Sequence, residues 1–240
     1  MQLAYQNLEI EQIYHQVFHA DKLALTVCAA NEQEGVTSLA LALAQRHTLA
    51  GYRTLVVDLN LYRPSIHAVD PAQKSSTTGL VDDAGFQPPS LITSEHLDGV
   101  LLGVPAPQQR VHIMALRHGQ GLAQQLQQWL TQVDCVIFDT SPINQINQHN
   151  IPAEHVAAIS DGAILMVMAG KTSQAMLSNA MGKLDKAKAK LLGCVYNDAQ
   201  NPRLAYELLR QTNKAGRWLG PLSVAIKKGI SNSRLLKVEV

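Results

Sequence analysis

The sequence predicts an α/β fold with a doubly wound, mostly parallel sheet flanked by helices. Short, continuously apolar runs alternate with longer helical stretches along its 240 residues, which is the rhythm of β-α-β units. Continuous apolar runs are typical of strands that are buried on both faces of a parallel sheet. Two of these runs end in an aspartate, and another leads through a glycine-containing turn into a helix.

Six apolar runs are expected to form strands. They span residues 23–28, 54–57, 111–116, 135–138, 163–168 and 191–196. Four helices are expected, over residues 37–50, 122–132, 174–190 and 202–212. Gly51 stands where a glycine commonly ends a helix. Residues 70–107, which are rich in Pro, Gly, Ser and Thr, are expected to form a long excursion with short helices around 79–81 and 94–96.

The chain is expected to consist of one domain with an appendage at each end. Residues 1–20 form an amphipathic helix with Leu8, Ile10, Ile13 and Val17 near helical spacing, either packed on the domain or used as an oligomer contact. Residues 21–215 form the domain, and residues 216–240 form a C-terminal tail.

Composition excludes several classes of protein. Twenty Lys and Arg against nineteen Asp and Glu give a net charge of +1, which argues against a nucleic-acid binder that relies on positive charge. No apolar run approaches the roughly 20 residues of a membrane span, and the first residues lack the features of a signal peptide. We therefore expect a cytoplasmic protein. Its three cysteines (Cys28, Cys135 and Cys194) share no metal-ligand spacing and are expected to be small core residues.

The run at residues 23–28 leads into a turn that could bind phosphate. The turn contains Gly35-Val36-Thr37-Ser38 before the next helix. Strand, loop and helix start in this order are the layout of a P-loop, whose backbone N–H groups bind phosphate and whose hydroxyl binds Mg²⁺. However, Val36 occupies the lysine position and Ala30 the first glycine position. Taken alone, the pattern is a weak signal and is better explained by an ordinary strand-to-helix turn.

Two further strands end in carboxylates, Asp58 and Asp139. Ligands of open parallel sheets bind at the carboxyl ends of the strands. Aspartates at such a position commonly hold Mg²⁺ or its water molecules. The alternative for each aspartate is a helix cap.

The order of these motifs resembles the bacterial tyrosine kinases of capsule and exopolysaccharide systems, which belong with the MinD and ParA families among the deviant P-loop ATPases. The resemblance covers residues 11–197 and includes the glycine turn, residues 57–64, residues 136–142, the stretch 160–173 and residues 192–197. It implies a P-loop NTPase fold of the MinD/ParA-like (SIMIBI) type. It also implies that Gly35, Thr37, Ser38 and Asn197 bind Mg-ATP or Mg-ADP, with Thr37, Asp58 and Asp139 as magnesium ligands.

The sequence departs from the family's pattern where the chemistry would occur. Val36, Asn60 and Tyr62 replace the expected lysine, acidic residue and arginine. The family's Glu-Xaa-Xaa-Arg-Xaa-Xaa-Arg motif, used in ring assembly, is matched only by Glu11, with neither arginine present. The tail also lacks the tyrosine cluster that the kinases phosphorylate. We therefore expect that catalysis is lost first and that any nucleotide binds weakly.

The resemblance and its departures predict a catalytically degenerate domain, an adaptor or regulator of exopolysaccharide or capsule biosynthesis and export. Its expected partner is a polysaccharide co-polymerase of the inner membrane, through which it would lie at the membrane periphery. One alternative is an active MinD/ParA-type ATPase with an unusual loop, in which a neighbouring subunit or Lys171 supplies the missing charge. In the ordinary interpretation, Lys171 is a turn residue. Another alternative is a protein-binding scaffold without nucleotide.

Overall fold

The computed structural model describes residues 6–19, 23–69, 85–117, 120–145, 147 and 150–199. The described residues up to Asn197 belong to one compact unit. Its helices are α1 (Leu8–Val17), α2 (Val36–Leu49), α4 (Arg110–Arg117), α5 (Gln120–Trp129), α6 (Ala153–Ile159) and α7 (Gln174–Lys186), with a short 3-10 helix η1 (Ile143–Gln145). Its strands are β1 (Leu23–Ala29), β2 (Thr54–Leu59), β3 (His67–Ala68), β4 (Ser90–Thr93), β5 (Leu101–Val104), β6 (Cys135–Thr140), β7 (Gly162–Met168) and β8 (Leu191–Asn197). Within these ranges, no helix is both long enough and apolar enough to span a membrane.

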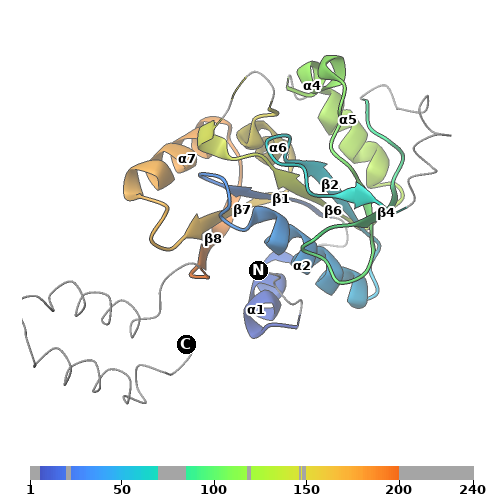
Figure 1. Ribbon diagram of the computed structural model, residues 1–240, viewed down its shortest axis with the longest axis horizontal. Helices are drawn as coiled ribbons and strands as arrows, with labels where there is room; N and C mark the ends of the chain where they lie inside the picture. Colours follow the sequence, from blue (N-terminus) through green and yellow to red (C-terminus); the bar gives the residue numbers. More distant parts are fainter. Residues whose placement is uncertain are drawn as a thin grey trace, which may run out of the picture. The chain divides into compact units, whose positions relative to one another are not determined.

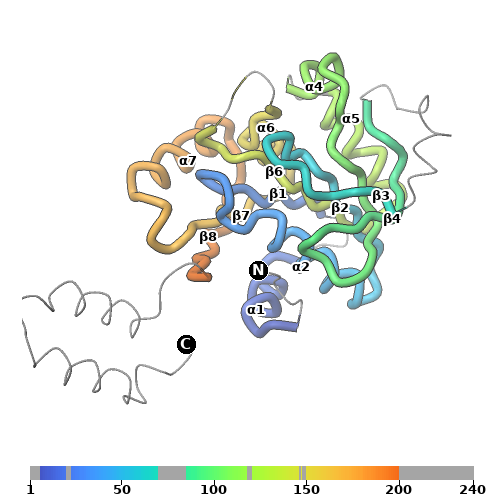
Figure 2. The backbone as a smooth tube through the Cα atoms, viewed as in Figure 1, coloured from blue at the N-terminus to red at the C-terminus, as the bar shows by residue number. Residues whose placement is uncertain are grey.

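All eight described strands belong to one sheet (Figures 1 and 2). Their order is β3-β4-β5-β2-β6-β1-β7-β8. Neighbouring strands from β5 to β8 are parallel, whereas β3 pairs antiparallel with β4 and β4 with β5. The expected doubly wound, mostly parallel α/β fold is therefore confirmed. The carboxyl ends of β2, β6, β1, β7 and β8 meet at one edge of the sheet, which is where such folds bind ligands.

Alternate residues of the central strands build a core on each face of the sheet. Leu25 and Val27 of β1 pack in the cluster formed with α1 and α2. Ala24 packs in a second cluster with α4, α5 and α6, and Cys28 in a third with α6 and α7. Figure 1 shows α2 on one side of the sheet and α5 and α6 on the other. Side chains of β1 that alternate along the strand thus enter opposite cores, as a period of two requires.

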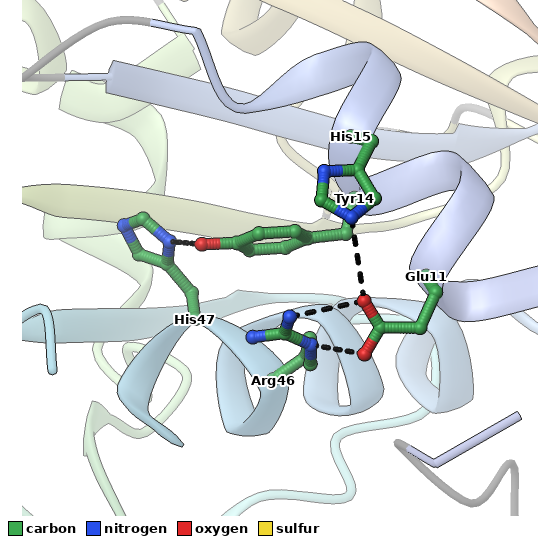
Figure 3. A network of polar contacts seen from close by, with 5 residues as sticks. All are labelled: Glu11, Tyr14, His15, Arg46 and His47. Atoms are coloured by element: carbon green, nitrogen blue, oxygen red, sulfur yellow. Dashed lines mark hydrogen bonds and ion pairs between the residues drawn. The ribbon is translucent and has the colours of Figure 1, made fainter. Parts of the chain in front are cut away.

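Helix α1 packs on α2, which confirms the first of the two uses expected for it (Figure 3). The Tyr14 hydroxyl lies 2.9 Å from His47 Nδ1, and both residues are buried. The Arg46 guanidinium binds the Glu11 carboxylate, and its central carbon lies 4.5 Å from the centre of the Tyr14 ring. Of the residues expected on the apolar face, Ile10 and Val17 are buried, whereas Leu8 is 68% exposed. An oligomer contact through α1 stays a prediction.

Residues 111–116 form α4, so the expected strand is wrong. Val111 and Met114 are exposed, and Leu116 is buried. Apolar residues in this run recur at intervals of three as well as two, and a short run of this kind does not separate helix from strand. On the side of β2 that faces away from β6, the neighbouring strand is β5. This strand lies in the segment expected to be an excursion.

The expected excursion contains ordered structure that the sequence analysis does not foresee. Strands β4 and β5 both lie in it, and the short β3 precedes it. Residues 94–96 form a turn, closed by a 3.1 Å hydrogen bond from Leu97 N to Ser94 O, and not the expected short helix. The expected helices around 79–81 and over 202–212, and the tail 216–240, lie outside the described residues. Helix α6 is a further element that was not predicted.

The cysteines differ in burial. Cys28 and Cys135 are buried in the core, as expected, whereas Cys194 is exposed. The prediction is wrong for Cys194 because β8 is an edge strand of the sheet, with several exposed residues.

Candidate functional site

A loop of residues 30–35 joins β1 to α2 at the carboxyl edge of the sheet. Gln33 and Gly35 have positive φ angles of 59° and 100°, and a Cβ on Gly35 would lie 2.7 Å from Asn197 Nδ2, so the loop requires glycine there. Among the described residues, the backbone N–H groups of residues 31–37 donate no hydrogen bond to another protein atom. Unbonded N–H groups before a helix N-terminus form a concavity that favours anions.

Helix α2 begins at Val36, the position at which a P-loop carries its lysine. The Val36 side chain is 9% exposed and belongs to the apolar cluster that contains Ile164 and Met166. An apolar side chain therefore occupies the position at which a P-loop carries its charge. Thr37 and Ser38 follow in the first turn of the helix, as predicted.

Asp58 of β2 and Asp139 of β6 lie directly opposite each other on neighbouring parallel strands. Both residues are fully buried. Thr37 Oγ1 donates a 2.6 Å hydrogen bond to Asp139 Oδ2, whereas Asp139 Oδ1 is buried without a hydrogen-bond partner. The structure thus brings together the three residues that the sequence analysis assigns to magnesium. A buried carboxylate oxygen without a donor is costly to the fold, and a cation is the partner that would satisfy it.

Burial alters the acidity of this carboxylate pair. It raises the pKa of Asp58 to about 6, although three backbone N–H groups counteract the shift. Those donors are Asn60 N at 2.8 Å and Ser65 N and Ile66 N at 3.3 Å each. Burial, followed by the neighbouring charge of Asp58, raises the pKa of Asp139 well above its usual range. A divalent cation between such groups would favour their ionised forms.

The two other replaced positions lie in the turn after β2. Asn60 donates its backbone N–H to Asp58, and its side-chain Oδ1 accepts a 3.3 Å hydrogen bond from Arg63 N. Asn60 thereby shapes the turn. Tyr62 is 44% exposed and makes no polar contact with the described part of the chain. Neither side chain has an acidic or cationic group for phosphoryl transfer.

The turn after β7 contacts the loop directly because β7 is the parallel neighbour of β1. Lys171 Nζ donates a hydrogen bond of 2.5 Å to the Glu32 carbonyl oxygen. Thr172 Oγ1 donates a 2.6 Å hydrogen bond to Glu34 Oε1, and the Glu34 side chain is buried with Oε2 unpartnered. Sequence reasoning gives Thr172 no role at the loop. The signal that could have found it is the Gly-Lys-Thr turn at the end of a strand next to β1.

Further side chains hold the loop from β8, α7 and η1. Asn197 Nδ2, a predicted nucleotide ligand, donates to the Glu34 carbonyl oxygen at 3.1 Å. Asn31 Nδ2 donates to Glu34 Oε1 at 3.0 Å and contacts the sulfur of Met176 at 3.4 Å. The backbone N–H of Asn144 donates to Ala30 O at 3.0 Å. The loop is thus fixed by contacts to carbonyl groups and side chains, which leaves its N–H groups available.

These residues fit a magnesium nucleotide. The described residues contain no cluster of three or more His, Cys, Asp or Glu that could hold a metal ion without other ligands. Mg²⁺ does not need such a cluster, because it is usually held by one or two carboxylates, retained water and the phosphates of its substrate. Thr37, Asp58 and Asp139 would supply the protein oxygens, and the N–H groups of the loop would bind phosphate. The assignment of these residues stays a prediction.

No family model matches the chain, but individual proteins do. The tyrosine-protein kinase YwqD of Bacillus subtilis is 27% identical over 177 residues, which are 72% of this chain and 71% of that protein. The kinase domain of the Escherichia coli tyrosine kinase ETK superposes with a TM-score of 0.56 at 16% identity, over 78% of this chain and 72% of that one.

A nucleotide-bound structure of another enzyme also has this fold. The cobyrinic acid a,c-diamide synthase of Mycobacterium smegmatis, solved with bound ADP and magnesium, superposes with a TM-score of 0.51 at 15% identity. The match covers 73% of this chain and 74% of that one. Sequence and fold therefore agree: the chain is a homologue of the bacterial tyrosine-protein kinases, with the fold of their kinase domains and of MinD/ParA-like P-loop ATPases.

Proposed function

We propose that the chain is a catalytically degenerate relative of the bacterial tyrosine kinases, which binds a magnesium nucleotide and acts as an adaptor or regulator in exopolysaccharide or capsule biosynthesis and export. The observation that carries the proposal is a loop before α2 that places Thr37 against Asp139 but has Val36 at the lysine position. Nucleotide binding and catalysis require different groups at such a site.

Nucleotide binding is supported by the groups that remain. The N–H groups of residues 31–37 donate to no protein atom in the described structure, and α2 directs its positive end toward them. Thr37 is already hydrogen-bonded to Asp139, whose second oxygen has no partner. ADP or ATP with Mg²⁺ would satisfy both sets of groups, and the metal would neutralise phosphate charge.

Loss of catalysis is supported by the groups that are missing. A hydrogen bond to a charged group contributes about 1.5–3 kcal/mol, so a missing lysine weakens ground-state binding by roughly 10- to 100-fold. A single cationic group that stabilises the transition state of phosphoryl transfer contributes about 10³–10⁵ in rate. Val36 cannot supply this charge, and Asn60 cannot act as the acid or base that the family places there. The rate therefore falls much further than the affinity.

Calorimetric titration of the full chain with Mg-ADP and Mg-ATP tests the binding half of the proposal. We expect weak binding by the native chain and roughly 10- to 100-fold tighter binding by Val36→Lys. Equal affinities in the two proteins would mean that the lysine position no longer limits binding. Absence of binding in both proteins would overturn a nucleotide site and favour a scaffold that recognises only protein.

The catalytic half is tested by incubating the purified chain with Mg-ATP and probing for phosphotyrosine. We expect no phosphotyrosine on the chain, with an active bacterial tyrosine kinase as the positive control. Phosphotyrosine that disappears in Asp139→Ala would overturn the degenerate-kinase proposal.

The proposed partner is an inner-membrane polysaccharide co-polymerase, whose cytoplasmic segment would dock on the domain and hold it at the membrane. This part of the proposal rests on the family resemblance. It is tested by fractionating host cells with and without the co-polymerase gene. We expect the chain in the membrane fraction only when the co-polymerase is present, and an unchanged distribution would contradict the proposal.

A second candidate, an active MinD/ParA-type ATPase, is favoured by one observation. Lys171 contacts the loop, and in this candidate its charge would also stabilise the transition state. This candidate predicts steady ATP turnover that is abolished by Asp58→Ala and by Asp139→Ala. Turnover that persists in both variants would indicate a contaminating enzyme.

A further inference from the structure

We propose that Lys171, from the turn after β7, supplies part of the positive charge for ground-state phosphate binding that Val36 does not. The inference rests on the proposed function, because it concerns the same nucleotide site. It assigns a binding role to a residue outside the loop and outside the strands that hold the aspartates.

The loop has no positive charge of its own. Residues 30–38 contain neither lysine nor arginine, but they contain Glu32 and Glu34. The Glu34 side chain is buried, and its Oε2 has no partner. A nucleotide diphosphate brought to this loop would therefore meet negative groups, and its binding requires a cation from elsewhere in addition to Mg²⁺.

Lys171 is the basic residue that the fold places at the loop. Its Nζ donates to the Glu32 carbonyl oxygen, and among the described residues no other lysine or arginine side chain has a hydrogen bond or ion pair with residues 30–37. The ammonium group has three protons, and this contact uses one. The remaining protons are available to a phosphate oxygen at the mouth of the loop.

The turn that carries Lys171 is itself firmly built. Gly170 has a φ angle of 70°, and the N–H groups of Lys171 and Thr172 both donate to Met168 O, at 3.2 and 3.0 Å. Thr172 Oγ1 links this turn to Glu34 of the loop, and Ser173 caps α7 by accepting from Met176 N. The position of the ammonium group relative to the loop is thus set before a ligand arrives, which reduces the entropy lost on binding.

Calorimetry with Mg-ADP on the full chain tests the inference. Lys171→Met keeps the carbon stem and removes the charge, so we expect it to weaken binding roughly 10- to 100-fold. Lys171→Arg should retain most of the affinity, because it restores the charge. The matched control is Lys186→Met near the end of α7, where Lys186 is exposed, and it should leave the affinity unchanged. Melting temperatures of all variants show whether the fold is kept.

A double-mutant comparison distinguishes charge supply from simple support of the loop. In Val36→Lys the loop regains its own cation, so Lys171→Met should cost much less there than in the native background. If Lys171 only braces the loop, the loss is equal in both backgrounds, and the inference is overturned. Native Mg-ADP affinity in Lys171→Met would also overturn it while leaving the proposed function intact. Absence of Mg-ADP binding by both the native chain and Val36→Lys would overturn the two together.

Discussion

Asp139 illustrates, at the scale of a single residue, how a binding site costs stability. Its carboxyl group is fully buried, with one oxygen bonded to Thr37 and the other unpartnered. An apolar or neutral group at this position would reduce the stability of the fold less than a buried carboxylate does. The residue is therefore better explained by a ligand than by packing.

We predict that Asp139→Asn stabilises the free chain at pH 8 and weakens its binding of Mg-ADP. Burial raises the pKa of Asp58 to about 6 and that of Asp139 well above its usual range. The two carboxyl groups therefore favour the folded state at low pH, where they are protonated. This contribution to stability is lost as pH rises through the folded-state pKa values. In urea unfolding, the free energy of unfolding should fall less between pH 5 and pH 8 in Asp139→Asn than in the native chain.

The control for this prediction is Asp98→Asn, because Asp98 is exposed. Its stability should follow that of the native chain at both pH values. Asp139→Asn should also weaken the calorimetric affinity for Mg-ADP by roughly 10- to 100-fold. A variant that is less stable at pH 8 and binds normally would show that Asp139 is an ordinary structural residue.

Single residues also show how far the sequence could predict the site. The sequence predicts a common site for Thr37, Asp58 and Asp139, because its pattern indicates the ends of two strands and the start of a helix at these positions. The burial of Val36 in the cluster that contains Met166 and the contact of Lys171 with Glu32 were not predictable in the same way. Both depend on the exact path of a loop and on long-range contacts, neither of which leaves a periodic pattern.

At the scale of elements, α1 and α2 form a contact that is sensitive to acid. His47 is buried and stacks with Phe18 and Tyr52, whose ring centres lie 4.4 and 4.5 Å away. Burial lowers the pKa of His47 to about 4. The contact therefore depends on the neutral imidazole, which is hydrogen-bonded to Tyr14.

We predict that this contact loses stability between pH 6.5 and pH 4. His47 takes up a proton near pH 6.5 in the unfolded chain but only near pH 4 in the folded one, so its stabilising contribution is complete above pH 6.5 and is lost as pH falls. The full effect is about 3 kcal/mol in the free energy of unfolding. His47→Phe keeps an aromatic ring and removes the titration.

Urea unfolding of His47→Phe at pH 7 and pH 4.5 measures the effect as a change relative to the native chain. The difference in unfolding free energy between variant and native chain should shift in favour of the variant at the lower pH. His67→Gln, at an exposed histidine of β3, should show no such shift. A difference that is the same at both pH values would contradict the prediction, whatever the stability of the variant.

A second prediction at this scale concerns β8, the edge strand. Because Cys194 is exposed while Cys28 and Cys135 are buried, a thiol reagent should modify one cysteine rapidly in the native chain. Burial also raises the pKa of the thiols of Cys28 and Cys135, which further suppresses their thiolate forms. Reagent titration should give three thiols in urea. Rapid modification of two or more cysteines in the native chain, or rapid modification that persists in Cys194→Ser, would contradict the assignment.

Most of the strands that were predicted are buried along nearly their whole length, with the edge strand β8 as the exception. The runs that became β1, β2, β6 and β7 are buried along their length, and their continuous apolarity is what a two-sided core demands. Strands β3 to β5 lie at one edge of the sheet, where half-exposed residues break the pattern. Helix α4 was mistaken for a strand because its few apolar residues fit both periods.

At the scale of the whole molecule, the candidate site exists only in the folded sheet. Its groups come from the loop after β1, from α2, β2 and β6, and from the turn after β7. Residues as distant in sequence as Thr37 and Asp139 meet because β1, which leads into α2, pairs in parallel with β6. The unfolded chain presents no such arrangement of groups. A ligand that binds here therefore binds the native state alone, and its binding is coupled to folding of the unit.

We predict that Mg-ADP raises the melting temperature of the chain in a concentration-dependent manner. At a ligand concentration of 100 times Kd, linkage adds about 2.7 kcal/mol to the free energy of unfolding. For a chain of this size, each kcal/mol shifts Tm by roughly 2–4 °C, so the shift should reach about 5–11 °C. Differential scanning calorimetry in increasing Mg-ADP measures it.

AMP, which lacks the β-phosphate, should shift Tm less than ADP does. Asp139→Asn should abolish most of the difference between the two nucleotides. Equal shifts with AMP and ADP would place the ligand elsewhere on the molecule, because the loop at residues 30–35 offers its N–H groups to phosphates.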